Sequence, residues 1–400
     1  MPRREHGAVD RFAALPQPSV LPWLASARDA AWTALRTHGF PGTGDEAWKY
    51  TSARRVLRLD VGRTPPAAAV PDDLPEGPRL VFVDGVVSAP LSEPGAHARA
   101  LSDGEAPSGE VGDGFSALNL AFVTDGAVVD VPAGVDAGVL HLVHHGTGGR
   151  LQALRHHVRV GRGAKLVLVT HWTGAGADLT TAVTHLVVDG DLALVDLQEA
   201  HEGAMQVHRI TAEVGAAGAL HSTAVSLGAA IARTEIHATL AESGASATLD
   251  GLYLGRGTQH ADHHTHVDHA VPDCTSRQRY KGILADKARG VFTGSVLMRR
   301  DAQRSDSEQV NHSLLLSDDA VANTRPQLEI HADDVKAAHG ATVGRLDAES
   351  QFYLQQRGLT AHQARSLLTW AFAGEIVGAV PEAARSRVEA RVRAWLEEVT

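Results

Sequence analysis

The chain has 400 residues, of which 44% are hydrophobic and only 4% aromatic, and its 39 glycines indicate many tight turns between small aliphatic segments. A formal net charge of −10 excludes a protein that tracks nucleic-acid phosphates, because such proteins need a basic surface. No stretch approaches the roughly 18 uncharged apolar residues of a membrane span, so we expect no membrane contact. The N-terminus lacks an apolar signal-peptide core and Cys274 is the single cysteine, which together favour a cytoplasmic protein.

The first part of the chain has helical character. Apolar residues at helical spacing over 19–39 predict an amphipathic helix, and EAWKYT at Glu46–Thr51 predicts a short helical or turn segment. The prolines of residues 62–78 forbid regular structure and mark a linker. We therefore expect an N-terminal helical region at residues 1–75.

From Arg79 onward the apolar pattern changes to period two. RLVFVDGVV predicts a hairpin that turns at Asp84-Gly85, and the following strands are broken by glycine rather than by helices. Turn glycines recur about every 26 to 28 residues, which indicates a structural repeat, at Gly163, Gly190, Gly218 and Gly244. The pattern favours a mainly β fold with a right-handed parallel β-helix core over 76–345, and an antiparallel sandwich is the alternative.

The helical period returns at the C-terminus. Thr360 and Gln363 form a capping-box pattern before one helix, and Pro381 opens a second. We place a C-terminal helical region at residues 346–400. Its apolar faces would cap the open end of the solenoid, dock a partner, or do both.

Histidine is the abundant ligand type, with 23 copies, and the densest cluster is QHADHHTHVDH at Gln259–His269. On a strand, one face would carry groups that could hold a first-row metal ion, namely His260, Asp262, His264, His266 and Asp268, and the other would carry His263 and His269. The alternative is a solvated polar face on the outer wall of a coil, since alternate imidazoles in a row satisfy no particular coordination polyhedron. A structural role is favoured still more for HLVHH at His141–His145.

Two further positions are candidate ligands. His339 follows a strand-like stretch and precedes Gly340 and Gly344, so we expect an imidazole at a strand-to-turn boundary. Cys274 follows the histidine cluster and is either a small buried hydrophobe or a soft ligand near His269.

Several catalytic signatures are absent from the sequence. No G-x-x-x-x-G-K-[ST] loop is present, and GRGAK at Gly161–Lys165 is too short to replace it, so we expect no nucleotide binding by this chain. HExxH, GxSxG and CxxC are missing as well. We expect a non-catalytic protein.

The chain resembles the SufB/SufD family of iron–sulfur cluster assembly scaffolds over most of its length. Five stretches carry the resemblance: EAWKYT at Glu46, FSALNLAF with the DG ending at Gly126, HAVPDCTSRQRYKGIL from His269, DKARGVFTGSV from Asp286, and QVNHSLLLSDDAVANTRPQLEIHADDVKAAHGATVGRLDAESQFYLQQRG from Gln309. The resemblance is to the SufD type, because SufB-type members are typically longer and richer in functional cysteines.

The resemblance implies a β-helix that pairs with a SufB-like subunit and a C-terminal helical region that engages the SufC ATPase. The family histidine in the HGAT segment faces the subunit junction as an iron or cluster ligand, and His339 is the matching position. Cys274 also matches a family position, but Ala337 stands where relatives can carry a second cysteine. A cluster or iron ion would therefore be held transiently and shared with the partner, which would supply the thiolates. A homodimer of this chain is the alternative assembly when no SufB-like subunit is present.

Two functions from other classes stay as alternatives. A β-helix carbohydrate lyase or hydrolase could use Asp262 and Asp268 as acid, base or metal ligands. A metal-binding protein could use the face from His260 to His269.

Overall fold

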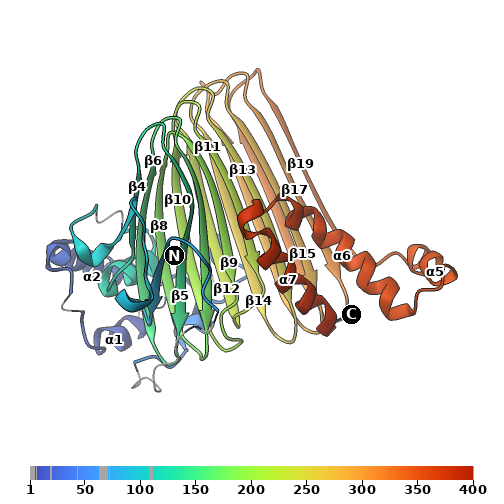
Figure 1. Ribbon diagram of the computed structural model, residues 1–400, viewed down its shortest axis with the longest axis horizontal. Helices are drawn as coiled ribbons and strands as arrows, with labels where there is room; N and C mark the ends of the chain where they lie inside the picture. Colours follow the sequence, from blue (N-terminus) through green and yellow to red (C-terminus); the bar gives the residue numbers. More distant parts are fainter. Residues whose placement is uncertain are drawn as a thin grey trace.

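The computed structural model describes residues 5, 7–18, 20–42, 44–62, 71, 73–107 and 111–399. It shows a long two-sheeted solenoid with helices packed against it at both ends of the chain (Figure 1). Of the linker predicted at 62–78, residues 63–70 and 72 lie outside this description.

Helices near the N-terminus form the first block. They are α1 (Gly7–Ala13), η1 (Pro22–Leu24), α2 (Ala25–His38), η2 (Glu46–Trp48) and α3 (Ala53–Leu57). The helix expected over 19–39 is present, although the α-helix begins only at Ala25, after the 3₁₀ turn that contains Pro22. It stops at Gly39, whose φ of +64° favours glycine.

A further helix, α4 (Gly114–Phe122), interrupts the region in which only strands were expected. The Asp113 carboxylate accepts a hydrogen bond from the Ser116 amide at 2.9 Å and so caps the helix. FSALNLAF is mainly apolar and is buried on all sides, including at Ser116 and Asn119, where it packs against α2, β6 and β8. For that reason it lacks the exposed polar face that marks a helix in a sequence.

The strands fill the middle of the chain. The first are β1 (Arg79–Val83), β2 (Val86–Val87) and β3 (Ala98–Ala100), with 3₁₀ turns η3 (Ala89–Leu91) and η4 (Leu101–Asp103). The others, in chain order, are β4 (Ala127–Val131), β5 (Asp136–Gly146), β6 (Leu151–Val160), β7 (Lys165–Gly174), β8 (Leu179–Val188), β9 (Asp191–Gln198), β10 (Met205–Val214), β11 (Ala219–Ser226), β12 (Ile231–Leu240), β13 (Ser246–Gly255), β14 (His260–His269), β15 (Thr275–Leu284), β16 (Arg289–Met298), β17 (Asp306–Leu315), β18 (Val321–Ile330) and β19 (Lys336–Gly344).

Strand pairing confirms the parallel β-helix and excludes the antiparallel sandwich. From β4 onward each strand pairs in parallel with the strand two places further along the chain, which produces a ten-stranded and a nine-stranded sheet. One coil separates Lys165 from its partner Asp191, and a later, longer coil separates Arg289 from Val321. The repeat seen in the glycine spacing is therefore real, and it lengthens toward the C-terminus. The hairpin at Asp84-Gly85 is confirmed as well.

Small aliphatic and aromatic side chains fill the interior between the two sheets. Tyr253 and Tyr280 are 1% and 3% exposed, and Tyr280 packs on Phe292 at a centroid distance of 4.7 Å. Gly282 lies against the Tyr253 ring, in a space that a Cβ atom could not share. Glycine is used there for close packing rather than for a turn.

The C-terminal helices cover the outer face of the ten-stranded sheet. They are α5 (Ala348–Gln356), α6 (Ala361–Ala379) and α7 (Glu382–Val399), and α6 begins with the predicted capping box of Thr360 and Gln363. A hydrophobic cluster joins α6 and α7 to the sheet, and α6 contacts β13 and β15. These helices therefore lie along the side of the solenoid and do not cap its end. α5, which was not expected, has no buried residue and projects away from the solenoid (Figure 1).

The last coil of the solenoid is bare. β18 and β19 are the outermost strands of the two sheets, and each pairs on one side only. His339 lies within β19 rather than at a turn, and Gly340 and Gly344 belong to the same strand. The expectation of a turn at these two glycines was wrong, because a glycine in a sequence does not distinguish a turn from a strand position without a large side chain.

Candidate ligand site

The backbone register places His339 on the interior side of the last coil. His339 pairs with Gln309 of β17, and in-register residues of parallel strands project from the same face. The Gln309 side chain is completely buried in the interior of the solenoid. His339 is exposed because no further coil covers it.

Below His339, a chain of polar side chains crosses three coils. The Gln309 Nε2 donates to the Gln278 Oε1 at 3.1 Å, and the Thr265 hydroxyl donates to the same oxygen at 2.5 Å. All three side chains are at most 3% exposed. Hydrogen bonding between neighbours permits polar groups in an otherwise apolar interior.

His269 lies in the same interior, at the end of β14. Its Nε2 is 2.8 Å from the Ser276 hydroxyl, which in turn is 2.8 Å from the Ser307 hydroxyl. Burial lowers the pKa of His269 to about 4, so the imidazole is neutral at pH 7. Ala337, which pairs with Ser307, continues this row at the open end.

Cys274 is enclosed in the hydrophobic interior and is 1% exposed. Its thiol contacts the carbonyl oxygens of Glu242 and Pro272 at 3.5 and 3.6 Å, and burial raises its pKa. The register separates it from His339 by two strands and by four residues along the strand, which corresponds to about 10 Å and about 13 Å. The structure therefore does not bring these two candidate ligands together, and the environment of Cys274 is that of a small buried hydrophobe.

The histidine cluster of β14 alternates between faces as predicted, with His263 and His269 inside the solenoid. On the outer face, the buried Arg233 guanidinium donates to Glu235 and Asp262. Burial alone would raise the pKa of Asp262, but the Arg233 charge outweighs it and holds this pKa well below its ordinary value. Asp268 is likewise used, in a bidentate pair with Arg299 at 3.0 and 2.6 Å.

The N-terminal segment is fastened to this outer face. The Thr51 hydroxyl donates to Asp262 and lies 2.7 Å from His260 Nε2, and the Trp48 ring stacks 4.1 Å from the Arg233 guanidinium carbon. The cluster is therefore neither solvated nor free to bind metal with its carboxylates, and we assign it to the attachment of the N-terminal block. The sequence analysis did not single out Arg233, and it did not connect Trp48 of EAWKYT to the histidine cluster, because these contacts join residues far apart along the chain.

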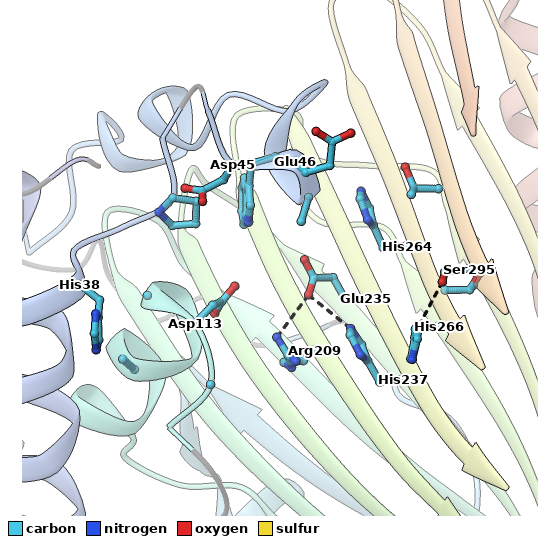
Figure 2. A pocket seen from close by; sticks show the side chains of 18 of the residues that line it. His38, Asp45, Glu46, Asp113, Arg209, Glu235, His237, His264, His266 and Ser295 are labelled. Carbon is cyan, nitrogen blue, oxygen red and sulfur yellow. Dashed lines mark hydrogen bonds and ion pairs between the residues drawn. The ribbon is translucent and has the colours of Figure 1, made fainter. Parts of the chain in front are cut away.

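A cleft of about 560 Å³ opens beside this attachment, between the N-terminal segment and the nine-stranded sheet (Figure 2). On its floor Arg209 lies 3.5 Å from Glu235, His237 lies 3.9 Å from the same carboxylate, and His266 Nδ1 is 3.2 Å from the Ser295 hydroxyl. Burial lowers the pKa of His237 to about 4. Among the described residues no group of three or more His, Cys, Asp or Glu side chains is arranged to hold a metal ion.

Comparison with known proteins agrees with the fold. A family model described as "SUF system FeS cluster assembly, SufBD core domain" matches residues 142–372. The SufD iron–sulfur cluster assembly protein of Escherichia coli is 30% identical over 90% of this chain and 89% of its own length. SufBD family proteins from Synechocystis (slr0076) and Mycobacterium tuberculosis (Rv1462) are 29% and 32% identical, over 90% and 89% of this chain and 88% and 89% of their own lengths.

A two-sheeted parallel β-helix with helical blocks on its flanks is thus the architecture of an assembly protein of the SUF system. The chain belongs to the SufBD family of iron–sulfur cluster assembly proteins and is of the SufD type. Among the described helices, none is both long and apolar enough to cross a membrane.

Proposed function

We infer that this protein is a non-catalytic scaffold subunit of the cytoplasm, which pairs through its open end with a SufB-like subunit and carries His339 to the junction as a ligand of iron or of a forming cluster. The observation that carries the proposal is the bare last coil, with an exposed imidazole on the interior side of its edge strand.

Two edge strands side by side support pairing at this end. Long uncovered edges are normally shielded in soluble proteins, because their unpaired backbone groups bind other strands. Here β18 and β19 expose hydrophobic side chains as well, with Ile330 and Val343 at 43% and 46% exposure. A second β-helix of the same width would cover both edges at once, and a homodimer would use the same surface when no SufB-like chain is present.

The C-terminal helices supply a second surface, which we assign to a SufC-type ATPase. Phe352 and Tyr353 of α5 are 63% and 57% exposed, and large exposed aromatic side chains are typical anchors of protein interfaces. Glu375 of α6 joins this block to the sheet through ion pairs with Lys281 and Arg279 of β15.

These connections suggest how ATP could act on the junction. β15 is separated from β19 only by β17, so a displacement of α6 reaches the open edge through two strand pairings. Closure of two ATPase copies would then strain the paired β-helices and open the junction to iron and sulfur, as a shift between two states with different nucleotide affinity. This chain would bind no nucleotide itself.

The cargo would be shared between subunits. His339 offers one nitrogen ligand, and Cys274 is enclosed away from the edge, so thiolates for a cluster would come from the partner. The cluster or iron ion is here the material being assembled and not a resident cofactor of this chain.

Co-expression with a SufB-like chain and a SufC-type ATPase tests the proposal. The His339→Ala chain should still co-purify with both partners, while iron and labile sulfide in the complex fall at least tenfold. His312→Ala is the matched control, because His312 lies on β17 in the adjacent coil but projects from the outer face, where it contacts Thr342. Undiminished cluster formation with His339→Ala would remove His339 from the function, and failure to co-purify the wild-type chain would reject the scaffold.

A further inference from the structure

Among the described residues, none donates a hydrogen bond to one buried acceptor near the open end. The Oε1 atom of Gln309 is unpaired, although the side chain is 0% exposed. An unsatisfied buried carbonyl costs about 1–3 kcal/mol, so such a group calls for an explanation. His339 is the residue that the strand register places next to it.

The orientation of the Gln309 amide is fixed from below. Its Nε2 donates to Gln278 Oε1 in the preceding coil, and Gln278 is held by the Thr265 hydroxyl. Oxygen and nitrogen diverge from the same amide carbon, so Oε1 is not the atom that faces Gln278. Gly294 on the opposite sheet makes room for this amide, because a Cβ atom there would collide with Gln309 Nε2.

The last coil contains a donor at this level. Paired residues of neighbouring strands lie about 4.8 Å apart, which allows an imidazole N–H to reach a carboxamide oxygen in the adjacent coil. Asn311 provides an internal comparison: its Oδ1 is also buried and unpaired, but the residue above it is Ala341, which has no side-chain donor. Only Gln309 has a histidine above it.

We propose that Gln309 is a positioning residue for His339: its Oε1 accepts the N–H of one imidazole nitrogen and thereby directs the lone pair of the other nitrogen toward the subunit junction. This inference rests on the proposed function, in which His339 is a ligand. A histidine that binds metal usually donates its second N–H to a carbonyl or carboxylate, which fixes the tautomer and the ring orientation. The chain from Thr265 through Gln278 to Gln309 extends this support through the interior of three coils.

The test uses the full chain in complex with a SufB-like subunit and a SufC-type ATPase. Gln309→Leu removes the acceptor at similar volume and should weaken ferrous iron retention by about 10- to 100-fold. Gln309→Glu keeps an acceptor of the same shape and should restore retention to within a few-fold of the wild type, because the Gln278 amide can turn over so that its unpaired Nε2 donates to the new carboxylate. Glu308→Gln is the control, since Glu308 lies on the same strand but projects outward and is exposed.

A second readout does not depend on iron. In the full chain labelled with ¹⁵N-histidine, His339 should show one dominant neutral tautomer, and Gln309→Leu should convert its two ring signals to a mixture of tautomers. Gly294→Ala, which displaces the Gln309 amide, should act in the same direction. Gly340→Ala is its control, because a Cβ atom at Gly340 only touches Val310, at 3.8 Å.

The outcomes separate the two proposals. Unchanged ring signals and unchanged iron retention in Gln309→Leu, with iron lost in His339→Ala, would overturn the role of Gln309 and leave the scaffold function intact. Altered ring signals in Gln309→Leu, with full cluster formation in His339→Ala, would support the hydrogen bond but reject His339 as a ligand. If Gln309→Leu does not fold, the Gly294→Ala and Gln309→Glu chains decide the question by the same two measurements.

Discussion

Two histidine-bearing regions of this molecule differ in what covers them. On the outer face of the nine-stranded sheet, His260 and its neighbours lie beneath the N-terminal segment, and Thr51 and Arg233 occupy their polar atoms. On the last coil, His339 is exposed on an edge strand that no element of the described residues covers. The density of histidines along a sequence is therefore a poor guide to a ligand site. An imidazole has a structural role when another segment covers it and its nitrogens are hydrogen-bonded. It is available to bind a ligand when it is uncovered.

The largest expected effect is the response to acid of the histidines that, like His260, are covered by other parts of the molecule. Burial lowers the pKa of His156 and His171 to about 3 and that of His263 to about 4, so these groups stay neutral in the folded chain below pH 6.5, where the unfolded chain binds protons. The free energy of unfolding should therefore fall as the pH drops from 6.5 toward 4. Each such histidine contributes up to about 1.4 kcal/mol per pH unit.

Urea unfolding at pH 7, 6 and 5 measures this dependence. Burial raises the pKa of Asp178 to about 6, and it also raises the pKa of Asp113, Glu199 and Asp250. These carboxyl groups gain protons in the folded state and oppose the trend, but the histidines whose pKa burial lowers outnumber them. A free energy of unfolding that is constant from pH 7 to pH 5 would show that these histidines are not buried in the neutral form.

Arg233→Met should show the next largest effect. It leaves Asp262 buried without its cation and leaves Glu235 with Arg209 alone, at 3.5 Å, and breaking a buried pair in this way costs about 3–5 kcal/mol. Denaturant unfolding of this variant would be compared with that of Arg304→Met, whose ion pair with Asp273 is exposed on both sides, at 58% and 46%, and whose loss should cost much less. Equal losses in the two variants would contradict the assigned role of Arg233 in fastening the N-terminal block.

A smaller loss is expected from overpacking the interior. In Gly282→Ala the new methyl group meets the Tyr253 ring, and such insertions cost about 1–3 kcal/mol. At the open end, Gly340→Ala should change stability by no more than about 0.5 kcal/mol. Thermal unfolding of both chains tests whether the last coil is as loosely enclosed as its exposure indicates.

The smallest effect on stability is expected for the paired change Phe352→Ala and Tyr353→Ala. Both side chains are exposed, so the free energy of unfolding should stay within about 0.5 kcal/mol of the wild type. Affinity for a SufC-type ATPase, measured by titration calorimetry, should fall at least tenfold if α5 is the anchor. Unchanged affinity would direct the search for the ATPase surface elsewhere.

Local patterns in the sequence were sufficient to predict the solenoid and the N-terminal capping box of α6. Period-two alternation and spaced glycines carry the β-helix, and Thr360 with Gln363 marks a helix start through contacts only three residues apart. A local sequence pattern does not show which residues a distant segment will cover. For this reason the sequence analysis predicted neither helix α4 nor the burial of Asp262 beneath Thr51. The same holds for Gln309, which becomes notable only when the strand register sets it beside His339.

The regular winding has a consequence for spacing. Every coil adds one strand to each sheet. The number of coils therefore sets the distance between the strands that contact α6, β13 and β15, and the terminal edge strand β19. Removal or duplication of one whole coil between them would move that edge by about 4.8 Å and leave the lateral surfaces of the other coils intact. The distance between the α6 contact and the terminal edge can therefore change only by whole coils. A partner that binds both places must fit the number of coils between them.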